Sequence, residues 1–160
     1  MGRRSLLYVE TSVFGFYYDE EPRNVLRREA VRMLFQQIAI GLLDAVTSPA
    51  TSGELAEAAE PVKGRLLGLL EGIPAIRAEE AEVRRMAELY LRERVVPPGE
   101  DLDARHAAYA TVGRADVIVS LNLRHLANEW AERRLNSVNL REGYPLVSIR
   151  TPEQVVLYED

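Results

Sequence analysis

The stretch SLLYVETS, residues 5–12, places a carboxylate and two hydroxyl residues directly after a short apolar run. Residues 6–9 are apolar without alternation, a pattern typical of a strand that helices cover on both faces, as in parallel sheets. Glu10 then falls at the carboxyl end of this strand, the edge of an open α/β sheet where ligands bind. Glu10 is therefore a candidate site residue. The alternative is a solvated loop acid or part of a helix cap, with Thr11 or Ser12 as the N-cap.

The composition excludes several classes of protein. The chain has 160 residues, 47% of them hydrophobic, and we expect one domain over residues 1–160. It has no Cys and only two His, so thiolate sites are excluded, a zinc site is disfavoured, and any metal is expected to be a hard cation on oxygen ligands. The net charge of −5 predicts weak non-specific affinity for nucleic acid unless arginines cluster. Without a signal peptide or an apolar run of transmembrane length, the sequence predicts a soluble cytoplasmic protein with no membrane contact.

The remaining chain alternates between apolar runs and amphipathic patterns, which predicts repeated strand–helix units. Beyond the first strand, we expect strands at 42–47, 74–76, 116–122 and 146–149. Helices are predicted at 23–40, 50–59, 61–70, 79–95, from about 100 to 110, at 126–140 with Trp130 as its largest anchor, and after Thr151. Phe14, Phe16, Tyr17 and Tyr18 are expected to pack near Glu10, and part of their surface to be buried in a dimer or under a partner peptide.

Two further carboxylates are predicted to lie at the same sheet edge as Glu10. Glu54 lies about one and a half turns into the predicted helix 50–59, where its side chain can lean back over the strand ends. Asp103 lies near the start of the helix that follows Pro97-Pro98-Gly99. It shares a face with Ala107 and Ala110, whose small side chains let this helix lie close to the sheet. Simple capping by an acid fits Asp101 better than Asp103.

The strand at 116–122 separates two further polar candidates. Asp116 begins this strand and lies about 20 Å from Asn122 at its end, so only Asn122 can share the sheet edge with Glu10. We interpret Asp116 as a solvated or capping group at the opposite edge. His106 is predicted to be a packed, hydrogen-bonded core histidine, with a supporting role beside the site as the alternative.

Together these positions predict a site of four residues, Glu10, Glu54, Asp103 and Asn122. Three carboxylates gathered at one edge repel each other strongly without a cation, and oxygen ligands favour Mg²⁺ or Mn²⁺. We expect Glu10, Glu54 and Asp103 to be the metal ligands. A site of this kind is suited to phosphoryl chemistry, because the cation neutralises a phosphate and lowers the pKa of a bound water.

The order of these motifs resembles the PIN domain, and within it the VapC-type toxins that have ETS after the first strand and N-x-x-H-x-x-N after the fourth. The resemblance covers nearly the whole chain. Its segments are YVETSVFGFY at 8–17, SPATSGELAEA around Glu54, DARHAAYAT at 103–111, DVIVSLNLRHLAN at 116–128, and GYP followed by IRTPEQV at 149–155.

The resemblance implies a three-layer α/β/α fold with a central, mainly parallel sheet of about five strands. It also implies a metal-dependent endoribonuclease that uses Mg²⁺ or Mn²⁺, forms a homodimer, cleaves RNA and is neutralised by a VapB-like antitoxin. The first three acids of the family correspond to Glu10, Glu54 and Asp103, and its fourth acidic position falls at Asn122. A longer first acid and an uncharged fourth residue imply one metal rather than two, and weakened activity.

Two other classes of function stay open. One is a catalytically weakened PIN scaffold that binds RNA or a protein partner, which the departures at Glu10 and Asn122 favour. The other is a phospho-receiver module, which also gathers acids around Mg²⁺. A receiver needs an Asp at the end of the third strand and a Lys near the fifth. The chain has Arg77 after residues 74–76, and its only lysine is Lys63, so this class is disfavoured.

Overall fold

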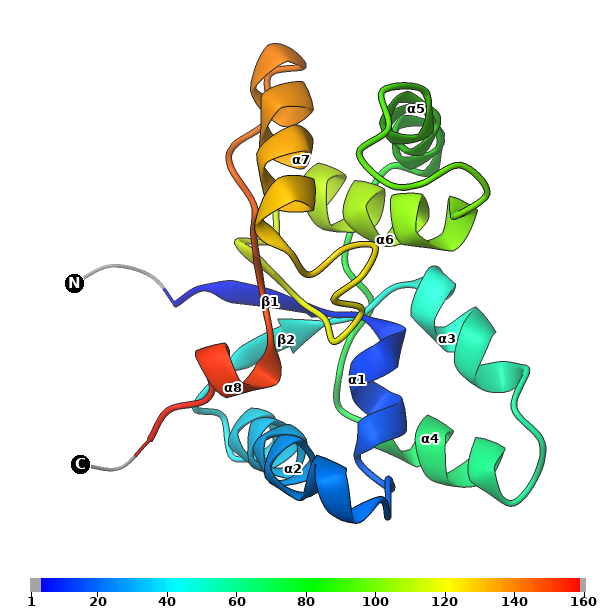
Figure 1. Ribbon diagram of the computed structural model, residues 1–160, viewed down its shortest axis with the longest axis vertical. Coiled ribbons are helices and arrows are strands. Elements are labelled where there is room, and N and C mark those ends of the chain that lie inside the picture. The colour runs from blue at the N-terminus through cyan, green and yellow to red at the C-terminus, as the bar shows by residue number, and fades with distance from the viewer. Residues whose placement is uncertain (1–3, 159–160) are drawn as a thin grey trace.

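The computed structural model describes residues 4–158, so the expected domain limits at 1 and 160 lie outside the described residues. Its centre is a parallel sheet with helices on both faces (Figure 1), an arrangement compatible with a three-layer α/β/α fold. The strand order is β2-β1-β3-β4. The strands are β1 (Leu6–Val9), β2 (Asp44–Val46), β3 (Val117–Val119) and β4 (Ser148–Arg150).

Eight α-helices connect and cover these strands in residues 4–158, with a short 3-10 helix over Pro22–Asn24 before α2. They are α1 (Thr11–Phe16), α2 (Val25–Ala39), α3 (Pro49–Ala56), α4 (Val62–Leu70), α5 (Glu80–Arg92), α6 (Asp101–Val112), α7 (Glu129–Arg141) and α8 (Pro152–Val155). None of the helices in the described residues is both long and apolar enough to cross a membrane.

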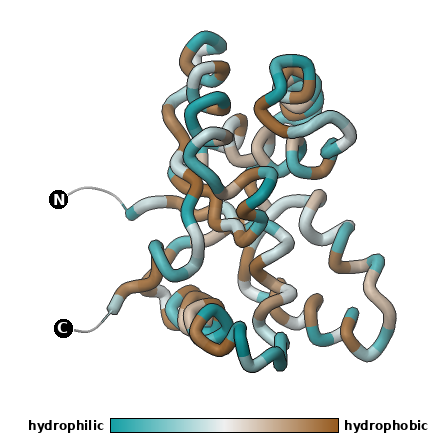
Figure 2. The backbone as a smooth tube through the Cα atoms, viewed as in Figure 1, coloured by the Kyte–Doolittle hydropathy of each residue, from teal (hydrophilic) through white to brown (hydrophobic). Residues whose placement is uncertain are grey.

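The sheet separates two hydrophobic cores because successive side chains of a strand point to opposite faces. Tyr8 and Ile118 contribute to the core beneath α5, α6 and α7. Leu7, Val9 and Val119 contribute to the core beneath α1, α2 and α4. Figure 2 shows hydrophobic residues along the central strands and hydrophilic residues on the outer turns of the helices. The unbroken apolar run at residues 6–9 predicted a strand covered on both faces, and this prediction is confirmed.

The predicted number of strands was wrong, because residues 74–76 do not form a fifth strand. Only Ala75 pairs with the sheet, as a single bridge to Thr47. Thr47 N donates to Pro74 O and Ile76 N donates to Thr47 O. Pro74 itself has no N–H to extend the ladder, and the chain turns soon afterwards into α5, where Glu79 is the N-cap.

Two side chains also differ from their predicted roles. Trp130 is 65% exposed, with the Arg134 guanidinium 4.7 Å from its ring centroid, so it does not anchor α7. The buried face of α7 instead carries Ala131, Leu135 and Val138. Asp116 lies at the amino edge of the sheet as predicted, but it is neither simply solvated nor a helix cap. Its Oδ2 accepts a hydrogen bond from Leu6 N at 2.7 Å and so ties the starts of β1 and β3 together.

The aromatic residues after β1 pack mainly inside the protein. Phe14 is fully buried and its ring contacts Phe35 at a centroid distance of 5.1 Å. Tyr17 contacts Phe35 and Tyr18 edge-on. Of the four aromatic side chains expected near Glu10, only Tyr18 is exposed, at 38%.

Candidate functional site

Glu10 directly follows β1 and is also the N-cap of α1. It therefore lies at the predicted sheet edge and also caps a helix, the alternative considered from the sequence. Its Oε2 accepts a hydrogen bond from Ser12 N at 2.9 Å. Its Oε1 accepts from Ser120 Oγ at 2.6 Å and from Ser12 Oγ. The carboxylate is thus held between the first turn of α1 and the end of β3, and the residue is only 4% exposed.

Glu54 extends from α3 toward the same edge, as its position in the helix predicted. Its Oε1 accepts hydrogen bonds from Thr11 Oγ1 at 2.6 Å and from His106 Nε2 at 2.7 Å. Burial alone would raise the pKa of Glu54. The hydrogen bonds from His106 and Thr11, together with the charges of His106 and Arg105, outweigh burial and hold its pKa below the usual value of 4.5. Glu54 is therefore a carboxylate at neutral pH.

His106 links these acids to a buried hydrogen-bond chain. It is fully buried and hydrogen-bonded, as predicted, but it also lies within the candidate site. Its Nδ1 lies 2.7 Å from the hydroxyl of Tyr8, which in turn lies 2.6 Å from Ser48 Oγ. In a neutral ring that donates from Nε2 to Glu54, Nδ1 accepts the Tyr8 proton. Burial raises the pKa of Tyr8 above its ordinary value, so this hydroxyl keeps its proton.

Sequence reasoning did not assign Tyr8 or Thr11 to the site and gave His106 a supporting role beside it only as the alternative. Two signals were present in the sequence. His106 follows Asp103 by three residues, a spacing that places both on one face of a helix. Tyr8 precedes Glu10 by two residues in a strand, and a hydroxyl on an otherwise apolar buried strand requires a polar partner.

Asp103 and Asn122 form the second half of the candidate site. Asn122 Nδ2 donates to Asp103 Oδ1 at 3.1 Å, so the residue at the fourth predicted position contacts the third acid directly. Asp103 is 7% exposed, and its Oδ2 accepts no hydrogen bond from any residue between 4 and 158. Burial, and then the charges of Glu10 and Glu100, raise the pKa of Asp103 above its usual value of 3.8.

All four predicted residues follow or lean over the carboxyl ends of the strands, but they divide into two adjoining groups. Glu10 and Glu54 face His106, whose Nε2 lies 3.9 Å from Glu10 Oε2. Asp103 faces Asn122 on one side and His125 on the other. Each histidine-containing group, Glu10–Glu54–His106 and Glu100–Asp103–His125, offers three possible ligand atoms within 4.8 Å of one another.

The donor atoms of this site fit a divalent cation. Carboxylate oxygens are the ligands that Mg²⁺ and Mn²⁺ prefer, and Asp103 Oδ2 accepts no hydrogen bond from the described residues. Glu10 and Glu54 belong to one histidine-containing group and Asp103 to the other, and the charge of Glu10 contributes to the raised pKa of Asp103. Glu10, Glu54 and Asp103 are the residues that would hold such an ion.

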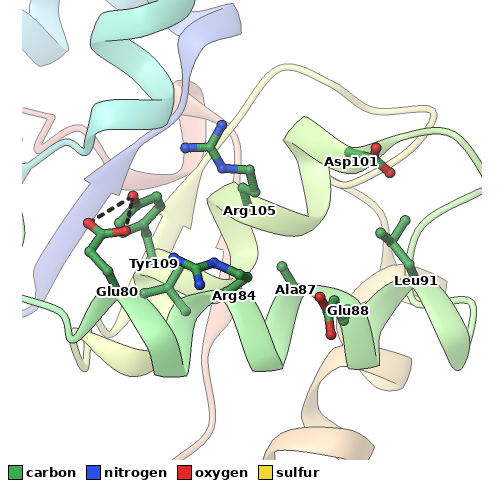
Figure 3. A pocket seen from close by; sticks show the side chains of 9 residues that line it. Glu80, Arg84, Ala87, Glu88, Leu91, Asp101, Arg105 and Tyr109 are labelled. Atoms are coloured by element: carbon green, nitrogen blue, oxygen red, sulfur yellow. Dashed lines mark hydrogen bonds between the residues drawn. The ribbon is translucent and has the colours of Figure 1, made fainter.

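A separate cavity of about 440 Å³ lies between α5 and α6, and Glu10, Glu54 and Asp103 are not among the residues that line it. Figure 3 shows Arg84 and Arg105 in this cavity, with the Tyr109 hydroxyl donating to the Glu80 carboxylate. Asp101, Arg105 and Tyr109 recur at four-residue intervals and line one side of α6. Asp103 lies about 200° around the helix from Asp101 and points to the site instead.

Comparison with known proteins adds no identification. No protein-family model matches the chain, and no curated protein matches it.

Proposed function

We propose that this protein is a metal-dependent endoribonuclease of the PIN type, which hydrolyses RNA phosphodiester bonds in the cytoplasm with Mg²⁺ or Mn²⁺. The observation that carries the proposal is the placement of Glu10, Glu54 and Asp103 at one sheet edge, with a buried Asp103 oxygen left without a hydrogen bond. A buried carboxylate oxygen without a hydrogen bond costs free energy, and a cation beside it removes that cost.

The proposed roles follow from the contacts of each side chain. Glu10 and Asp103 would hold the ion, with Glu54 beside it. Glu54, ionised and held in place by Thr11 and His106, would orient the attacking water. Asn122 fixes Asp103 by donating to Oδ1. When bound, the cation neutralises the phosphate charge and lowers the pKa of the attacking water.

The sequence resemblance to VapC-type toxins supports the same activity and extends the proposal to partners. On that basis we propose that the chain forms a homodimer and is neutralised by a VapB-like antitoxin. The alternative function is a weakened PIN scaffold that binds RNA or a protein without cleaving. Two observations favour this alternative: three hydrogen bonds already engage Glu10, and Asn122 carries no charge.

Cleavage of structured RNA, with analysis of the product ends, tests the proposal. We expect cleavage with Mg²⁺ or Mn²⁺, loss of cleavage with EDTA, and products with 5′-phosphate and 3′-hydroxyl ends. Asp103→Asn should reduce the rate by orders of magnitude. Products with 2′,3′-cyclic phosphates, or cleavage that survives both EDTA and Asp103→Asn, would exclude this mechanism. RNA binding without cleavage would support the scaffold instead.

A further inference from the structure

Glu100, Asp103 and His125 form a group that the proposed nuclease mechanism does not use as a whole. His125 Nδ1 lies 3.5 Å from Asp103 Oδ2 and 3.5 Å from Glu100 Oε1. The three ligand atoms all lie within 4.8 Å of one another. The Asp103 atom that faces this group is the buried Oδ2, which accepts no hydrogen bond from any described residue.

Helix capping does not explain the two acids. Glu100 is the N-cap of α6, but its side chain makes no capping hydrogen bond. Asp103 lies in the first turn of α6, and its one hydrogen-bonded oxygen, Oδ1, accepts from the side chain of Asn122 rather than from a backbone amide. Acids at a helix start are ordinarily stabilised by free amide groups. In this group neither side chain uses them, and both face His125 instead, at the distance of an ion pair or of two ligands of one ion.

We propose that Glu100, Asp103 and His125 form a cation site of their own, which takes a divalent transition ion such as Mn²⁺, Co²⁺ or Zn²⁺ through one imidazole nitrogen and two carboxylate oxygens. Imidazole is a good ligand for transition ions and a poor one for Mg²⁺, which prefers oxygen. Ligands about 2.1 Å from a tetrahedral ion lie about 3.4 Å apart. The two spacings of 3.5 Å around His125 Nδ1 match this value.

The side chains also leave an ion a path from solvent. The side chains of His125 and Glu100 are 27% and 40% exposed, whereas that of Asp103 is 10% exposed and forms the floor of the group. The other histidine-containing group lacks these properties. His106 is fully buried, and both of its ring nitrogens already have hydrogen-bond partners, Tyr8 and Glu54. We therefore assign the transition ion to His125 rather than to His106.

This site does not depend on the proposed nuclease function, although the two share Asp103. Its ligand His125 belongs to neither the proposed oxygen-ligand set nor the group that orients the attacking water. A transition ion at this place would hold the loop after β3 against the start of α6, because His125 and Asp103 come from these two segments.

Titration of the metal-free protein with Co²⁺ alone tests the site, because a nitrogen ligand and the coordination number of Co²⁺ are visible in its absorption spectrum. We expect a Co²⁺ site whose visible absorption bands show a nitrogen ligand, and His125→Gln and Glu100→Gln each to weaken binding at that site at least tenfold. Glu54→Gln, in the neighbouring group, is the matched control and should leave the Co²⁺ affinity within about twofold.

The melting temperature of each metal-free variant shows that it is folded, and Zn²⁺ calorimetry gives a second measure of affinity. Co²⁺ binding that His125→Gln leaves unchanged, or Co²⁺ binding lost equally in Glu54→Gln, would overturn the assignment. If the wild type binds neither Co²⁺ nor Zn²⁺, the assignment is also overturned, and Glu100, Asp103 and His125 form only an ion pair. If the His125-dependent site is found while the protein cleaves no RNA, only the nuclease proposal fails. If RNA is cleaved and His125→Gln has no effect on Co²⁺, only the cation site fails.

Discussion

The imidazole of His106 lies with its Nε2 2.7 Å from Oε1 of Glu54, inside the protein and one helical turn beyond Asp103. The same ring contacts Tyr8 through Nδ1, and Tyr8 contacts Ser48. This buried chain runs from α6 through β1 to the start of α3. The orientation of a candidate catalytic carboxylate is therefore set by groups that belong to the core.

Shortening His106 should destabilise the protein strongly. His106→Ala removes bonds to Tyr8 and Glu54 and leaves a cavity in a fully buried position, and we expect a loss of about 2–4 kcal/mol in the free energy of unfolding. Tyr8→Phe, which keeps the ring and removes only the hydroxyl, should lose about 1–2 kcal/mol. Urea denaturation measures both. If both variants unfold within about 0.5 kcal/mol of the wild type, the chain contributes nothing to stability.

Asp103→Asn should raise the melting temperature of the metal-free protein. Burial and the charges of Glu10 and Glu100 raise the pKa of Asp103, so its ionised form destabilises the folded state at neutral pH. The expected gain is roughly 2–4 °C, the shift that about 1 kcal/mol gives in a domain of this size. Because this penalty exists only where Asp103 is ionised, the gain should vanish as the pH falls below 3.8.

The matched control for that variant is Asp101→Asn, in the same turn of α6 but exposed, which should not raise the melting temperature. Millimolar Mn²⁺ should stabilise the wild type and not Asp103→Asn, since binding to the folded state alone raises the melting temperature. A metal-free Asp103→Asn protein less stable than the wild type at pH 7 would contradict the assigned repulsion.

Glu54→Gln should have the opposite dependence on pH. The pKa of Glu54 is lowered in the folded protein, so its stabilising contribution is fully present above 4.5 and is lost as the pH falls through the lowered value. Thermal unfolding between pH 3 and pH 8 should show Glu54→Gln less stable than the wild type at neutral pH and equal to it in acid. Glu57→Gln, on the exposed end of the same helix, should track the wild type throughout. A Glu54→Gln deficit that stays constant down to pH 3 would rule out the titration of this carboxylate as its cause.

Asn122→Asp restores an acid at the fourth position. Without metal, the new carboxylate lies against Asp103 Oδ1 and loses the donated hydrogen bond, so the apo protein should melt at a lower temperature. With Mn²⁺ the added charge should tighten metal binding and raise the cleavage rate if the missing acid limits the enzyme. Melting curves with and without Mn²⁺, alongside cleavage rates, measure the two effects. An apo protein as stable as the wild type would argue against the Asn122–Asp103 contact.

The proposed dimer can be tested on α2, which carries an exposed apolar residue, Leu26, at 83% exposure. We expect light scattering to give twice the chain mass for the wild type and the mass of one chain for Leu26→Glu. Leu140→Glu, at a residue on α7 that is 60% exposed, is the control and should remain dimeric. A wild type that is monomeric at high concentration and co-purifies with no partner would count against this assembly.

The main features of the fold could be predicted because they depend on local patterns. Apolar runs such as residues 6–9 indicated buried strands, and the positions of Glu10, Glu54 and Asp103 after strands or near helix starts indicated their common edge. Whether residues 74–76 form a strand depends on how far they pair with the chain after β2 beyond the single bridge at Ala75. No local sequence pattern reveals this. Which face of α7 is buried was equally hard to predict, because the exposed Trp130 and the buried Ala131 are neighbours in the helix.

The candidate site was predictable in its acids and not in the contacts that hold them. Carboxylates after strands can be found from spacing, but the bond from Ser120 to Glu10 joins residues 110 positions apart. The role of His106 depends on Tyr8 of β1, whose side chain lies on the face of the sheet that α6 covers. Contacts of this kind can be predicted only when the strand order is known, and the sequence does not determine that order.

The position of β1 between β2 and β3 has a consequence for synthesis of the chain on the ribosome. β2 follows soon after β1, but the opposite edge of β1 finds its partner only when residues 117–119 emerge. A nascent chain that ends before β3 therefore has an unpaired strand edge along β1, a surface prone to aggregation. It also lacks Ser120, which holds Glu10, and Asn122, which holds Asp103. The acids thus come into position together only late in translation.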